Sequence, residues 1–153
     1  MFDNFQMKEK NKEKWLGETL SNGGVAQSAQ STITERSGRA KGASIEVKAI
    51  IEDFRMQCVG GIIAAFDIWE MAILQGLLNN AETCTEITSD AVKDLEKIQY
   101  FFLRMVLDTP KTTPKVALLW ETGMLSMEGR VIKRKLRFIN HLNCSEGSLA
   151  NKI

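Results

Sequence analysis

Residues 89–130 read SDAVKDLEKIQYFFLRMVLDTPKTTPKVALLWETGMLSMEGR, and their first half has the clearest helical periodicity in the chain. Apolar residues recur there every three or four positions, which places them on one helical face: Val92, Leu95, Ile98, Phe102 and Met105. Ser89 and Asp90 suit the N-terminus, because their side-chain oxygens can accept from a free backbone N–H. The helix should end before Pro110. This stretch therefore predicts an amphipathic helix with one face packed in the core.

The opposite face of this helix carries a basic stripe with one aromatic residue. Its members are Lys93, Lys97, Tyr100 and Arg104, spaced four, three and four residues apart. Fixed positive charge with an aromatic ring is typical of surfaces that contact the backbone of nucleic acids. A solvated helix face has the same pattern, so both interpretations stay open.

Two further helix boundaries follow Pro110. Thr113 and Pro114 suit the start of a short helix that ends near Gly123, and Ser126 can begin another. The last helix has a less regular apolar face, formed by Met127, Val131, Leu136, Ile139 and Leu142. It also holds five bases in eight residues: Arg130, Lys133, Arg134, Lys135 and Arg137. These bases are a second candidate surface for nucleic acid.

The upstream half predicts two more long helical regions. Residues 25–56 indicate one long helix or two joined pieces, with a basic cluster formed by Arg36, Arg39 and Lys41. Gly60-Gly61 should break the chain, and residues 62–78 are apolar on most sides, which is typical of a central, buried helix. A short extended segment is expected near residues 14–20. A lone strand is unstable in water, so its partner should be missing or come from elsewhere.

The fold class is therefore all-α, with five to six helices in an irregular array around the central helix at about 62–78. A length of 153 residues suits one domain, which we expect at 14–143, with a poorly ordered N-terminus at 1–13 and a frayed tail at 144–153. Residues 57–90 hold five acids and no base, whereas residues 111–153 hold eight bases and three acids. A positive C-terminal surface could complement the acidic middle or face a polyanion.

Few patterns in the sequence point to catalysis or metal binding. Cys58, Cys84 and Cys144 are an odd number of widely spaced thiols, which argues against a disulfide framework or a zinc site and favours a reducing intracellular compartment, nuclear or cytoplasmic. His141 is the one histidine, and Asp67 with Glu70 is best interpreted as the wet edge of the apolar helix. No stretch reaches the length expected of a membrane span, so no membrane partner is expected.

Five motifs follow one another along the chain: EKWLG at 13–17, LLNNAET at 77–83, LEKIQYFFLR at 95–104, TPKVALLWETG at 113–123 and KLRFINHL at 135–142. Together they resemble the thumb and following region of non-LTR (LINE-type) retrotransposon reverse transcriptases. Residues 13–17, EKWLG, are similar to the family's (E/K)KYLG motif, and residues 77–83, LLNNAET, to its LL.NAE.W pattern. Residues 95–104, LEKIQYFFLR, resemble LEK.Q..FLR, and residues 113–123 resemble TP...L..ETG. Residues 135–142 resemble the family's last motif, (R/K)(K/R)L.F(L/I)(H/N)H(L/I). Trp15 and Cys84 depart from the family's usual tyrosine and tryptophan.

The resemblance implies a helical domain that holds an RNA–DNA or DNA duplex behind a polymerase active site. It places Lys14, Trp15 and Gly17 near the primer terminus. It also implies that the metal-binding aspartates lie upstream, in a palm that would use divalent metal ions and would be a partner of this domain. The sequence contains no pair of adjacent aspartates, so we expect no polymerase activity and no cofactor in this chain.

Two functional hypotheses remain. The first is a fragment resembling the template–primer-binding thumb of a retrotransposon RNA-directed DNA polymerase. The second is a helical protein–protein interaction or scaffold domain with no role in nucleic-acid binding. The second would be favoured if Lys93, Lys97, Arg104 and Arg36 lay scattered over separate faces of the fold, or if they paired with Glu82 and Glu86.

Overall fold

The computed structural model describes residues 12–15, 18–21, 24–53, 59–79, 81–82 and 87–144, and it describes the strands through their backbone. Five helical segments dominate this part of the chain, so the all-α prediction is confirmed. The elements are β1 (Lys12–Trp15), β2 (Glu18–Ser21), α1 (Val25–Asp53), α2 (Val59–Ile68), the π-helical turn η1 (Trp69–Ile73), α3 (Leu74–Leu77), α4 (Ser89–Val106), α5 (Lys115–Thr122) and α6 (Met127–Cys144).

The expected extended segment is a small antiparallel hairpin. β1 pairs with β2 in a register that runs from Lys12 opposite Ser21 to Trp15 opposite Glu18. The prediction of a strand whose partner is missing was therefore wrong, because two short strands satisfy each other within this chain. β1 also begins two residues before the predicted start of the domain, while residues 1–11 and 145–153 lie outside the described part.

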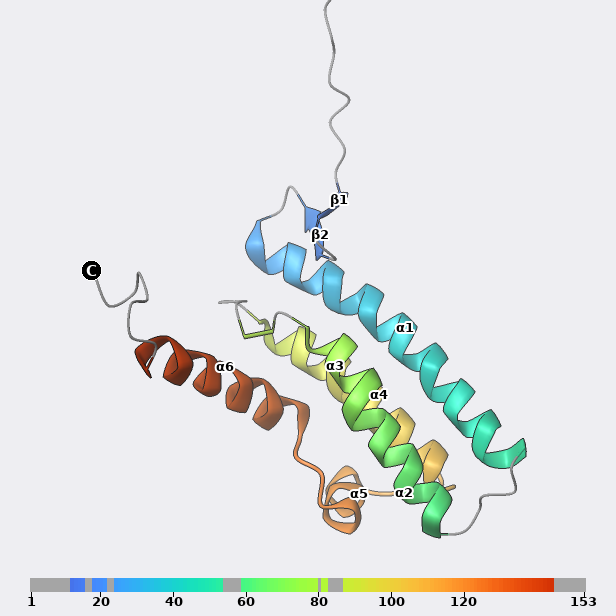
Figure 1. The fold of residues 1–153 in the computed structure, drawn as a ribbon. Helices are drawn as coiled ribbons and strands as arrows, with labels where there is room; N and C mark the ends of the chain where they lie inside the picture. Colours follow the sequence, from blue (N-terminus) through green and yellow to red (C-terminus); the bar gives the residue numbers. More distant parts are fainter. Residues whose placement is uncertain are drawn as a thin grey trace, which may run out of the picture.

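The helices form an elongated array with α1 along one side and α6 along the other (Figure 1). The continuous α2–η1–α3 segment and α4 lie between them, and α5 sits at one end. α1 is one helix of 29 residues rather than two pieces. Gly60 and Gly61 belong to the first turn of α2, so they begin that helix and do not interrupt the chain before it.

The predicted central helix is buried along one face only. Ala65, Trp69 and Leu77 are buried, whereas Ile63 and Met71 are 55% and 72% exposed on the other face. By length and composition alone, residues 60–77 could cross a membrane: mean hydropathy is 1.3 over 18 residues, and a third of these residues are buried. The expectation that no stretch reaches this length and hydropathy was therefore wrong for this helix.

The core centres on a ring stack between η1 and α4. The rings of Trp69 and Phe102 are 4.4 Å apart and 21° from parallel, and Phe66 meets Phe102 edge-on at 6.1 Å. Trp69 and Phe102 are fully buried. α4 also contacts α1, α5 and α6, while α1 contacts β2, α4 and the α2–η1–α3 segment. The periodicity of α4 thus predicted its buried face correctly, with Leu95 and Ile98 beside Phe102.

The helix ends follow local capping chemistry. Thr88, one residue before the expected cap, accepts a hydrogen bond from the backbone N–H of Ala91 at 3.2 Å, and α4 then begins at Ser89. Gly123 ends α5 with a left-handed φ of 64°, a conformation that glycine adopts without steric cost. Ser126 caps α6 as predicted, by accepting from the N–H of Gly129 at 3.2 Å.

The apolar residues of α6 do not share one face. Met127 and Val131 are buried against the rest of the protein, whereas Leu136 and Ile139 are exposed. The single apolar face predicted for this helix was therefore wrong. Its irregular periodicity instead reflects two separate apolar surfaces.

Candidate nucleic-acid interface

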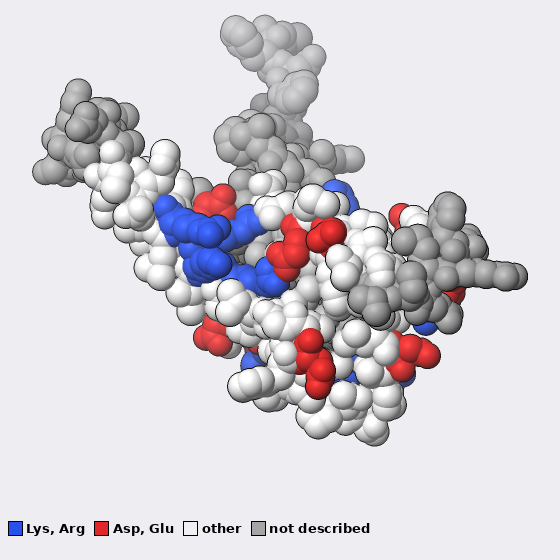
Figure 2. Space-filling model, turned by 60° about the horizontal axis from the view of Figure 1, so that its bottom comes forward, with Lys and Arg blue, Asp and Glu red and all other residues white. Residues whose placement is uncertain are grey.

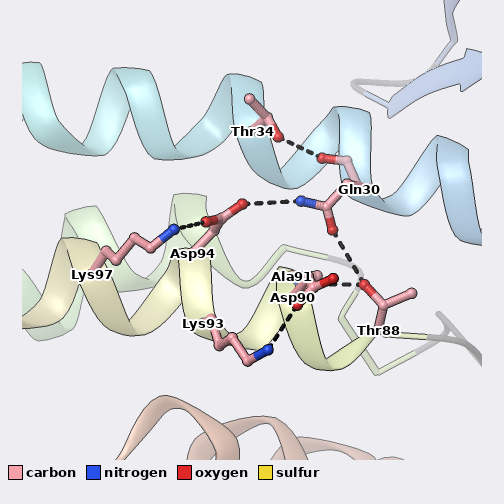
Figure 3. Close-up of polar contacts among 8 residues, drawn as sticks. All are labelled: Gln30, Thr34, Thr88, Asp90, Ala91, Lys93, Asp94 and Lys97. Atoms are coloured by element: carbon pink, nitrogen blue, oxygen red, sulfur yellow. Dashed lines mark hydrogen bonds and ion pairs between the residues drawn. The ribbon is translucent and has the colours of Figure 1, made fainter.

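The lysines of the predicted α4 stripe are paired within their own helix. Lys93 Nζ lies 2.8 Å from Asp90 Oδ1, and Lys97 Nζ lies 2.6 Å from Asp94 Oδ1 (Figure 3). Asp94 also accepts a hydrogen bond from Gln30 of α1 at 3.0 Å. Both lysines remain exposed, but each has a carboxylate beside it. The local field that they present to a polyanion is correspondingly weak.

The pKa values of one pair show this mutual neutralisation. The hydrogen bond from Lys93, followed by its positive charge, lowers the pKa of Asp90 below its ordinary value. The same hydrogen bond and charge raise the pKa of Lys93. Each partner therefore favours the charged form of the other.

The side chains of the other two members of the stripe, Tyr100 and Arg104, contact other parts of the protein. Tyr100 is buried, and Lys115 lies over its ring at 5.0 Å from the centroid. Arg104 donates to the backbone carbonyl of Thr113 at 3.2 Å. A buried ring cannot stack on a base without opening the core. The predicted stripe of four residues therefore does not form one continuous surface for nucleic acid.

The basic cluster on α1 is also engaged with the protein. Arg36 donates to the carbonyl of Asn79, Arg39 pairs with Glu35 at 2.5 Å, and Lys41 lies 5.3 Å from the centroid of Phe101. At the hairpin, Gly17 and the side chains of Lys14 and Trp15 lie outside the described residues.

The predicted bases of α6 border a cleft between α6 and the η1–α3 segment. The cleft has a volume of ≈ 520 Å³. Its charged lining residues are Arg130, Lys133, Arg134 and Arg137 on α6, and Glu70 and Glu82 opposite them; the His141 side chain also lines it. Figure 2 shows Lys and Arg side chains gathered around a hollow on this face of the molecule. The cleft brings together four of the predicted bases, whereas a smaller hollow of ≈ 370 Å³ beside α1 is lined by two of them, Arg36 and Arg39.

Two of these arginines hold α6 in place. Arg130 binds both carboxylate oxygens of Glu70 and donates from Nε to the carbonyl of Leu125 at 3.2 Å. Arg134 donates to the carbonyl of Leu78 at 3.0 Å and to the side chain of Gln75, and it lies 3.8 Å from Glu82. Both guanidinium groups are therefore fixed by the protein, which lowers the entropy that a ligand contact would cost.

The remaining bases of α6 have no hydrogen-bond or ion-pair partner among the described residues. Lys133 and Arg137 are exposed at the cleft, and Lys135 is half-buried on another side of the helix. The sequence identified all five bases but could not separate the two structural arginines from the other three. The role of Arg130 depends on Glu70, which lies 60 residues away in the sequence. The sequence analysis interpreted Glu70 only as part of the solvent-exposed edge of the apolar helix.

Comparison with known proteins adds no assignment: no protein-family model, no curated protein and no solved structure matches the chain. In the described part of the chain, no three His, Cys, Asp or Glu side chains lie close enough to hold a metal ion.

Proposed function

We propose that this chain is a nucleic-acid-binding helical domain, comparable with the thumb of a LINE-type reverse transcriptase, and that the cleft along α6 contacts the phosphate backbone. In this role it would hold an RNA–DNA or DNA duplex for a palm that carries the divalent metal ions. The chain itself would bind and not catalyse. The motifs between residues 13 and 142 support the resemblance.

One observation carries the proposal. Lys133 and Arg137 are exposed cations at a concave surface, and two further arginines beside them are already held in fixed positions. Backbone contact needs fixed positive charge and no reading of base edges. The α4 lysines are the weaker candidates, because Asp90 and Asp94 already neutralise them.

A salt-dependent titration tests the proposal. Fluorescence anisotropy of a labelled RNA–DNA hybrid should report binding by the full chain at about 50 mM salt and much weaker binding at about 200 mM. The double variant Lys133→Ala/Arg137→Ala should bind more weakly, and the slope of log K against log salt should fall by about two. Absence of binding at the lower salt concentration would disprove a nucleic-acid function.

A matched variant distinguishes an effect of the α6 cleft from an effect of net positive charge. Like the α6 variant, Lys93→Ala/Lys97→Ala removes two exposed positive charges, but each of these two lysines is paired with a carboxylate. We expect this variant to retain most of the affinity for the hybrid. Equal losses in both double variants would mean that net charge, and not the cleft, determines binding. Circular dichroism of each variant verifies that the fold is intact.

The second candidate is a helical protein–protein interaction domain. It is favoured by the internal pairing of Lys93, Lys97, Arg36 and Arg104, and by exposed apolar side chains on α6. A chain of this kind would bind the hybrid no better than a control protein of equal net charge.

A further inference from the structure

α6 has a third side that neither the core nor the cleft uses. Met127 and Val131 face the core, and Arg130, Arg134 and Arg137 face the cleft. Ile132, Leu136 and Ile139 lie on the remaining side and are 50%, 60% and 51% exposed. About half of each side chain is therefore open to solvent, although an aliphatic side chain of this size gains about 1.5–3 kcal/mol when it is fully buried.

The geometry of this side is that of a helix-pairing seam. The three residues, which we call the α6 seam, are spaced four and three residues apart, like the a and d positions of a heptad. Gly129 and Asn143 stand at the next positions, so the seam is about two turns long. A narrow row of side chains fits between the ridges of one other helix. A membrane-surface helix instead presents a broad apolar face, commonly with aromatic residues.

The charges beside the seam restrict which helix fits. Lys133 and Lys135 occupy the flanking e and g positions, where coiled coils form ion pairs with their partner. A second copy of α6 would set lysine against lysine, which opposes self-association. A partner helix with acidic residues at these positions would instead gain two cross-helix ion pairs.

We propose that the α6 seam is the docking surface for an amphipathic helix of another protein, with apolar residues at its own seam and acidic residues beside it. This inference gives the second candidate function its surface and its partner chemistry. It does not depend on nucleic-acid binding, because Ile132, Leu136 and Ile139 do not line the cleft, although Lys133 borders both surfaces.

Two synthetic peptides test the partner chemistry. Both have about four heptads with Leu at a and d, so that each can form a stable helix; one has Glu at e and g, and the other has Lys. Labelled peptides are titrated with the full chain in an anisotropy assay, to about 1 mM. The Glu peptide should bind at least about tenfold more tightly than the Lys peptide.

Variants of the chain locate the surface. Ile132→Ser/Leu136→Ser should weaken binding of the Glu peptide about tenfold or more, because it removes two apolar anchors. The matched control is Val116→Ser/Trp120→Ser on α5, which also removes two exposed apolar side chains, at 65% and 83% exposure. This control should bind the peptide like the unaltered chain. All substituted residues are exposed, so thermal melts should show that both variants fold.

Several outcomes would overturn the inference. These are binding of neither peptide, equal binding of both, or equal losses in the seam and α5 variants. A dimer in sedimentation that Ile132→Ser/Leu136→Ser dissociates would mean that a second copy covers the seam. The chain could also bind vesicles of phosphatidylserine and phosphatidylcholine. If Ile132→Ser/Leu136→Ser abolished that binding, a membrane and not a partner helix would cover the seam. The seam variant should still bind the RNA–DNA hybrid within about twofold of the unaltered chain, so failure of one proposal is distinguishable from failure of the other.

Discussion

Arg130 of α6 forms a bidentate ion pair with Glu70 of η1: Nη1 lies 2.8 Å from Oε2, and Nη2 lies 2.5 Å from Oε1. The Arg130 side chain is 14% exposed, so water screens this pair less than the surface pairs on α4. The two-pronged geometry fixes the position of α6 against the π-helical turn. It also places one negative charge inside the basic cleft.

Glu70→Gln should therefore have opposite effects on stability and binding. Loss of the charged pair should lower the free energy of unfolding by about 1 kcal/mol, measured by urea denaturation. Removal of a negative charge from the cleft should tighten binding of the RNA–DNA hybrid about twofold, or about 0.5 kcal/mol.

Asp67→Asn is the matched control for this prediction. Asp67 lies three residues earlier, is exposed and does not line the cleft. It removes the same charge, so we expect little change in stability and less change in binding. If both variants tighten binding equally, long-range charge and not the cleft controls affinity.

The stack of Trp69 on Phe102 should dominate the stability of the fold. Phe102→Ala leaves a cavity at a fully buried position, and we expect a loss of about 3–5 kcal/mol in the free energy of unfolding. The neighbouring Phe101 is only half-buried, so Phe101→Ala should cost clearly less. Urea denaturation followed by circular dichroism measures both. Similar losses would contradict the view that the ring stack is the centre of the core.

The sequence predicted those features that depend on local periodicity and capping. The buried face of α4 follows from apolar residues on one helical side, and the ends of α5 and α6 follow from Gly123 and Ser126. These signals lie within a few residues of their structural effect, so a single sequence contains them fully.

Features that depend on distant residues could not be predicted in the same way. The partner of Arg130 is on η1, and the partners of Arg104 and Arg36 are backbone carbonyls on other segments. Helical spacing put Lys97, Tyr100 and Arg104 on one side, but it could not show that α5 brings Lys115 over Tyr100. The same limit applies to α6, where only the packed fold separates buried Val131 from exposed Leu136.

Thr88 should stabilise α4 through its cap. Its hydroxyl oxygen accepts from the N–H of Ala91 at 3.2 Å, and the hydroxyl donates to Gln30 Oε1 at 3.2 Å (Figure 3). Thr88→Ala loses both contacts and should lower the free energy of unfolding by about 1 kcal/mol. Thr88→Ser keeps the hydroxyl and should cost much less in the same urea denaturation. Equal losses would assign the effect to the Thr88 methyl group instead.

Tyr100 should make stability depend on alkaline pH. Burial, and then the negative charge of Glu96, raise the pKa of its phenol above the ordinary value, while the positive charge of Arg104 opposes this shift. The folded state therefore holds this proton more tightly than the unfolded state does. The resulting stabilisation is complete below the unfolded pKa of about 10 and is lost as pH rises through the raised, folded pKa.

The variant Tyr100→Phe isolates this contribution. Between about pH 9 and about pH 11, the free energy of unfolding should fall more steeply for the unaltered chain than for Tyr100→Phe, which cannot ionise. Titration of lysines is common to both proteins and cancels in the comparison. Because Tyr100 is the one tyrosine in the chain, the ultraviolet absorbance of tyrosinate reports its ionisation directly. A phenol that titrates at its ordinary pKa in the folded protein, with parallel stability curves, would contradict the buried position of this ring.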